Sequence, residues 1–152
     1  MPKKPKTPKK ANKLLLTRAG EAVKNEFFLE SSMIISTLLE TRLRILITRV
    51  EKSNPGAGFN LEQCLKRLKY LHLSGKDPIL VKNIEIRLID DLRGWKNQRN
   101  AILKDLADIH VSPRRVEKLA EDGIVLLKAL TAACKLFKKE HKKPPPVQSP
   151  SA

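Results

Sequence analysis

The sequence has few aromatic residues: one Trp, one Tyr and four Phe among 152 residues. Its core must therefore be built mainly from aliphatic side chains, and the abundant Leu, Ile, Ala and Lys suit helices. Pro and Gly cluster only at the two ends and in one internal stretch, 53–58. No segment alternates apolar and polar residues long enough to compete with the helical patterns. These features predict an all-α protein.

Cysteine and histidine are also scarce. Cys64 and Cys134 lie far apart, with no Cys-x-x-Cys or Cys/His spacing. We expect both to be small buried residues in a reducing compartment. His72, His110 and His141 lack the spacing of metal ligands, so neither a zinc site nor any other cofactor is predicted.

Long apolar runs are missing as well. The run nearest the basic N-terminus, Leu14–Leu16, is too short for a signal peptide, and no segment has the length of a membrane span. We therefore expect a cytoplasmic protein with no membrane partner. Gly-rich phosphate loops and nucleophile elbows are absent, which leaves phosphoryl transfer as the catalytic chemistry to consider.

Positive charge is what the sequence has in excess. The net charge is +15, of which residues 1–13 carry +6, residues 138–152 carry +3 and the intervening part carries +6. This excess favours polyanionic partners through phosphate contacts and counterion release, without choosing between RNA, DNA and anionic lipid. The alternative is that the basic ends only keep the protein soluble.

The chain divides into three parts by composition. Residues 1–13 are a Pro/Lys-rich arm and residues 140–152 a Pro-rich tail, both predicted to be disordered. Between them, 14–139 form a helical domain. Apolar periodicity and capping signals predict a short helix at 14–24, followed by four longer ones at about 26–52, 61–73, 78–109 and 113–139.

The ends of these helices have clear sequence signals. Asn60 and Asp77 are placed as N-caps, Gly75 as the residue that ends a helix, and Ser112-Pro113 as another helix start. Short connections predict an antiparallel up-and-down four-helix bundle with a short extra N-terminal helix. Two of its helices are long for a small bundle, which favours a homodimer.

One helical face contains a charged residue where an apolar one is expected. Arg99 lies in the middle of a stripe whose other members are apolar. A buried unpaired guanidinium is costly, so this position marks either a function or a structural role, in which Arg99 reaches the edge of the bundle or pairs with a carboxylate on another helix. The stripe comprises Val81, Ile84, Leu88, Leu92, Trp95, Arg99, Ile102, Leu106 and Ile109.

A polar ridge runs beside this stripe. Arg93, Asn97, Asn100 and Lys104 follow one another at steps of four, three and four residues. Arginine can bind a phosphate with two hydrogen bonds, lysine can neutralise it, and an amide can orient a sugar or base edge. A solvated polar face with no ligand is the alternative. The predicted nucleic-acid contacts are Arg93, Lys96, Asn97, Arg99 and Lys104.

The stretch 95–105, Trp-Lys-x-Gln-Arg-Asn-x-x-x-Lys-Asp, resembles the signature helix of HEPN-domain proteins. The Arg of that motif falls on Arg99 and its polar neighbour on Asn100. The His of the motif falls on Lys104, which is a departure. The resemblance implies a helical bundle over roughly 26–139 and an RNA-related function, in many members metal-independent RNA cleavage across a dimer. It also implies toxin–antitoxin or defence systems, and hence a cognate toxin or antitoxin as a possible partner.

The departure at Lys104 matters chemically. A histidine exchanges protons near neutral pH, whereas an unperturbed lysine, with a pKa of about 10.4, stays protonated. If the protein is catalytic, Arg99, Asn100 and Lys104 are the candidate residues. Three hypotheses follow: a HEPN-like module that binds RNA or a nucleotide without cutting, an active metal-independent ribonuclease, and an adaptor homodimer with no nucleic-acid role.

Overall fold

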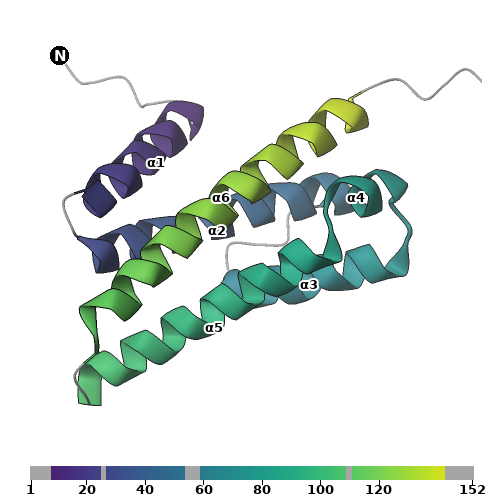
Figure 1. Cartoon of the computed structure of the whole chain (residues 1–152). Helices are drawn as coiled ribbons and strands as arrows, with labels where there is room; N and C mark the ends of the chain where they lie inside the picture. The colour runs from purple at the N-terminus through teal and green to yellow at the C-terminus, as the bar shows by residue number, and fades with distance from the viewer. Residues whose placement is uncertain (1–7, 25–26, 54–58, 109–110, 143–152) are drawn as a thin grey trace, which may run out of the picture.

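The computed structural model describes residues 8–24, 27–53, 59–108 and 111–142. Within these ranges the backbone is helical and contains no strand, which confirms the all-α prediction. None of the described helices is both long and apolar enough to cross a membrane. The six helices are α1 (Pro8–Lys24), α2 (Phe28–Glu51), α3 (Leu61–Ser74), α4 (Pro78–Asn83), α5 (Ile86–Asp108) and α6 (Pro113–His141) (Figure 1).

The predicted caps of α3 and α4 are confirmed. The Asn60 side chain accepts a hydrogen bond from the Gln63 N–H (2.9 Å), and the Gln63 side chain accepts one from the Asn60 N–H (3.0 Å). Gly75 ends α3 with a φ of 65°, which costs glycine little. Asp77 accepts hydrogen bonds from the first turn of α4. Ser112 occupies the N-cap position of α6 but makes no capping hydrogen bond with its side chain.

Two predicted boundaries are wrong. The helix expected over 78–109 is divided, because Ile84 is extended (φ −111°, ψ 100°) between α4 and α5. Ile84 is fully buried, and the break lets α4 pack on α6 and α3 while α5 turns to lie against α3 and α6. At the other end, α1 begins at Pro8, so 8–13 of the predicted disordered arm are helical. Residues 1–7 and 143–152 lie outside the described residues.

Four helices form a ring in which α2 packs on α3, α3 on α5, α5 on α6 and α6 on α2. The α1 helix covers α2 and α6. Arg44 of α2 donates a 2.8 Å hydrogen bond to the carbonyl of Phe59, which precedes α3, and Glu51 pairs with Arg67 further along both helices. The α2 and α3 helices therefore run in the same direction.

The direction of α5 is opposite to that of its neighbours. Lys69 pairs with Asp90 and Glu62 pairs with Lys96, so α3 and α5 are antiparallel. Figure 1 shows α6 running beside α2 in the same direction. The arrangement thus differs from the alternating up-and-down order expected from short connections. The reason is that Phe59 lies beside Arg44, two turns before α2 ends, so the chain returns before α3 begins.

The contact between α5 and α6 centres on Trp95, which is 2% exposed. Its indole N–H donates a 2.8 Å hydrogen bond to the carbonyl of Leu119. Gly123 lies under the ring, and a Cβ added there would come within 2.8 Å of a ring carbon. A glycine in the middle of α6 is therefore explained by the close approach of the indole. Trp95 belongs to the apolar stripe predicted from the sequence.

Candidate nucleic-acid interface on helix α5

The side chain of Arg99 extends away from the apolar stripe of α5 and contacts helix α2. Its Nη1 donates to the hydroxyl of Ser36 on α2, while Nε and Nη2 donate to the Asn100 side-chain oxygen at 3.3 and 2.9 Å. Burial lowers the pKa of the Arg99 guanidinium, and the negative charge of Glu40 opposes that shift. The structural alternative predicted a carboxylate partner on another helix, whereas the bonded partner on α2 is the hydroxyl of Ser36.

The contact between Arg99 and Ser36 could not be predicted from the sequence. The two residues are 63 positions apart, and neither residue type identifies the other as its partner. The Ser36 side chain is 7% exposed and small enough to admit the guanidinium between the helices. Two other buried serines, Ser31 and Ser32, precede it on α2 and bond to backbone carbonyls. The contact with Arg99 instead links two helices through side chains.

Lys96 was predicted to contact nucleic acid, and the structure places it elsewhere. The residue is 7% exposed, and its ammonium forms an ion pair with Glu62 of α3. Burial lowers the pKa of Lys96, and the positive charge of Arg99 lowers it further. Lys96 therefore belongs to the α3–α5 contact and does not present its charge to a ligand.

The remaining four candidates form an exposed ridge. Arg93, Asn97, Asn100 and Lys104 all have exposed side chains on one side of α5. Arg93 lies 3.7 Å from Glu62, with 45% of its side chain accessible. The ridge extends about 16 Å along the helix at 1.5 Å per residue, enough to follow two or three phosphates. Hereafter we call these four residues the α5 ridge.

The chemistry around Lys104 differs from that of a general base. Lys104 is exposed, about 7.5 Å along the helix from Arg99, and takes the place of the histidine in the motif. The neighbouring Asp105 pairs at 2.6 Å with Arg115 of α6. His110, which follows in the sequence, lies outside the described residues. The ridge can therefore bind an anion, but its described residues include no proton acceptor suited to neutral pH.

A second polar cluster lies between α2 and α3. Glu40 and Arg44 form an i,i+4 ion pair at 2.5 Å, and Arg44 also donates a hydrogen bond to the Phe59 carbonyl. Cys64 is fully buried beside them, and burial raises the pKa of its thiol. These contacts fasten the start of α3 to α2, which is a structural role.

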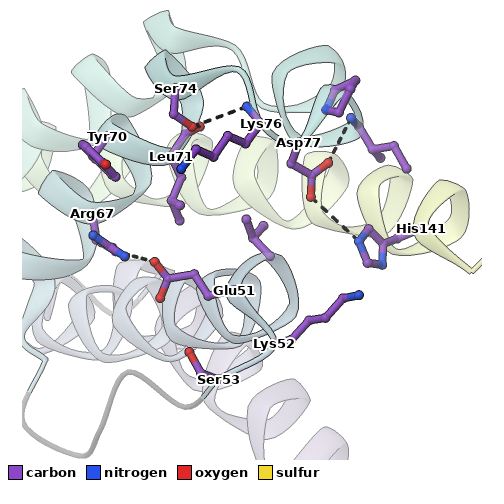
Figure 2. A pocket seen from close by; sticks show the side chains of 13 residues that line it. Glu51, Lys52, Ser53, Arg67, Tyr70, Leu71, Ser74, Lys76, Asp77 and His141 are labelled. Carbon is purple, nitrogen blue, oxygen red and sulfur yellow. Dashed lines mark hydrogen bonds and ion pairs between the residues drawn. The ribbon is translucent and has the colours of Figure 1, made fainter.

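A cavity of about 670 Å³ opens at the far end of the molecule, where α2, α3, α4 and α6 meet. Figure 2 shows that its charged groups face one another. Glu51 pairs with Arg67, and Asp77 lies 3.8 Å from the imidazole of His141. These pairs partly compensate the charges of this cavity within the fold, and none of the α5 residues lines it.

Comparisons of the chain with protein-family models, with curated protein sequences and with solved structures give no match. The geometry of α5 offers two cations, two amides and no described general base on one exposed ridge. Such a set can hold phosphates and orient a base or sugar by hydrogen bonds.

Proposed function

We propose that this protein is a HEPN-like module that binds RNA or a nucleotide without cutting it. The observation that carries the proposal is the exposed α5 ridge, in which Arg93 and Lys104 flank Asn97 and Asn100. The cations supply phosphate contacts. Asn97 supplies a donor and an acceptor for a base edge or the ribose hydroxyl, and Asn100 supplies its amide N–H donors, since its oxygen already accepts from Arg99. The ridge lies on a helix held rigidly by Trp95, so its groups keep their spacing.

The absence of cleavage is supported by how Arg99 is used. In the mechanism that the resemblance implies, this arginine would stabilise a charged phosphorane. Here its Nη1 is bonded to Ser36, and its two other nitrogens share the Asn100 oxygen. Reaching a phosphate would require breaking these bonds, and Lys104 offers no ready base. Binding therefore has more support than catalysis by Arg99, Asn100 and Lys104.

The proposed assembly is a homodimer, in keeping with a regulatory or antitoxin-like partner of a toxin–antitoxin or defence system. Leu103 and Leu106 support it, because they flank Lys104 on α5 with 37% and 44% of their surface exposed. Exposed leucines beside a binding ridge suit a surface covered by a second copy. A dimer formed by these leucines without any RNA binding would correspond to the adaptor alternative.

The test measures binding and cleavage of a labelled structured RNA in the presence of a chelator. The ridge variant Arg93→Gln/Lys104→Gln removes two exposed cations from α5. The matched control, Lys118→Gln/Lys128→Gln, removes two exposed cations from α6, so both variants have the same net charge. Arg99 is left intact, because its substitution would also disturb the α2 contact.

We expect the ridge variant to lose about tenfold or more in affinity, corresponding to about 1.4 kcal/mol, and the control to lose less. The slope of log affinity against log salt concentration should also become shallower by about 1.4–1.8 units for the ridge variant, because two phosphate contacts are removed. Equal losses would mean that charge alone is sensed and would overturn the ridge as the site. Cleavage abolished by Lys104→Gln would establish the ribonuclease, and absence of RNA binding would favour the adaptor.

A further inference from the structure

A groove of about 380 Å³ lies between α2 and α6, away from the α5 ridge. The residues around it come from both helices, which run in the same direction here. Its lining alternates cations with apolar side chains: Arg42, Ile45, Leu46, Arg49, Thr131, Cys134, Lys135, Phe137 and Lys138. We call this the α2–α6 groove.

The charges of this groove all have the same sign. Arg42 and Arg49 face Lys135 and Lys138 across it, and the lining has no acidic side chain. In the described part of the chain, neither arginine is within ion-pair distance of a carboxylate. The Nε of Arg42 is buried without a hydrogen-bond partner. Bringing cations together costs free energy, which an anion in the groove would recover.

The floor of the groove is apolar. Phe137 is fully buried, Leu46 is 2% exposed, and Ile45 forms part of the rim with 44% of its surface accessible. Burial raises the pKa of Cys134 to about 11, although the positive charges of Arg42 and Arg49 lower it. Desolvation therefore outweighs two nearby cations at this thiol. An inorganic anion would leave this apolar floor without a partner.

We propose that the α2–α6 groove binds a small amphipathic anion, a phosphate or carboxylate carrying an aliphatic chain. The headgroup lies between Arg42 and Arg49, with Lys135 beside it, and the chain lies along Ile45 and Cys134. The volume falls near the lower end of the roughly 300–1,000 Å³ typical of small-molecule sites. Lipid-like anions, free or at a bilayer surface, have this chemistry.

This site is independent of the proposed RNA function, since no residue of the α5 ridge lines the groove. The probe is dodecyl phosphate below its micelle concentration, measured by isothermal titration calorimetry on the full chain. Dodecanol tests the need for the headgroup, and adenosine monophosphate tests the need for the aliphatic chain. Vesicles with and without phosphatidylglycerol distinguish a bilayer headgroup from a free amphiphile.

Three variants locate the site. Arg49→Gln and Lys135→Gln remove groove cations whose loss leaves no carboxylate unpaired. The ridge variant Arg93→Gln/Lys104→Gln serves as the control. Thermal unfolding followed by circular dichroism verifies that each variant is folded.

We expect dodecyl phosphate to bind the natural chain and the ridge variant alike, and Arg49→Gln to weaken binding about tenfold. Dodecanol and adenosine monophosphate should bind at least tenfold more weakly than dodecyl phosphate. Equal weakening by groove and ridge variants, or equal binding of either comparison ligand, would overturn the proposal. Displacement of the probe by RNA, together with loss of RNA binding in Arg49→Gln, would instead make the groove an RNA site.

Discussion

Two cations of α5, Lys96 and Arg99, have partners within the protein that the arginines of the α2–α6 groove lack. On α5, Lys96 is paired with Glu62 and Arg99 is bonded to Ser36. In the groove, Arg42 and Arg49 face further cations and the partly buried thiol of Cys134, with no acid among the lining residues. A charged side chain that forms an ion pair or a hydrogen bond within the protein stabilises the fold. A charged side chain without such a partner is the better indication of a ligand.

The largest effect is expected from Glu62→Gln, which tests whether the ion pair between Lys96 and Glu62 stabilises the fold. Lys96 would then remain almost fully buried beside Arg99 without its carboxylate, so we expect the free energy of unfolding to fall by about 2–3 kcal/mol, which allows for partial exposure of Glu62. The control is Glu117→Gln, whose partner Arg114 is largely exposed at 3.4 Å and whose loss should cost under about 0.5 kcal/mol. Urea unfolding measures both, and similar losses would mean that the α5 pair is no more structural than a surface pair.

A second test changes how α5, the helix that carries Lys96 and Arg99, packs on α6. In Gly123→Ala the new methyl group would lie within 2.8–2.9 Å of the Trp95 ring, and we expect a loss of about 1–2 kcal/mol. Gly94→Ala, on α5 itself, meets nothing within 4 Å and should instead raise stability by about 0.5–1 kcal/mol. Two changes of the same sign, measured by thermal unfolding, would contradict the close packing of Trp95 on α6.

A smaller effect is expected from Ser36→Ala. The substitution removes the hydroxyl that accepts the Arg99 hydrogen bond, and we expect a loss of about 1 kcal/mol because the half-buried guanidinium keeps Asn100. Thr37→Ala, the adjacent exposed position, removes only a bond to its own helix and should change stability by less than about 0.5 kcal/mol. Equal effects would mean that the Arg99–Ser36 bond contributes nothing to stability.

The sequence was sufficient for those parts of the fold that local chemistry decides. The capping box at Asn60, the left-handed Gly75 and the Asp77 cap follow from single residues and their near neighbours. The break at Ile84 could not be predicted this way, because apolar spacing continues through it and only packing against α6 and α3 divides the helix. The parallel direction of α2 and α3 could not be predicted for a related reason. It depends on the contact between Arg44 and Phe59, which lie 15 positions apart.

The candidate site shows the same division. Periodicity correctly indicated that Arg99 is exceptional and that Arg93, Asn97, Asn100 and Lys104 share a face. It could not assign Lys96 to Glu62, because the pair joins residues 34 positions apart on different helices. The α2–α6 groove could not be predicted from the sequence. Arg42 and Arg49 are ordinary surface cations in the sequence, and only the packing of α6 on α2 places further cations opposite them.

The last test concerns the groove itself, through the titration of Cys134. Its thiol should titrate at about 11 rather than 9.0, as measured by the pH dependence of alkylation with mass spectrometry separating it from Cys64. A raised pKa in the folded state means that this group supports folding fully below pH 9.0 and loses that contribution as the pH rises through about 11. The positive charges of Arg42 and Arg49 lower this pKa, so Arg42→Gln/Arg49→Gln should raise it further, whereas Arg93→Gln should leave it unchanged. A Cys134 pKa that does not move in the double variant would mean that the groove arginines are neutralised within the protein, and the contrast with α5 would then fail, because both sets of cations would be compensated.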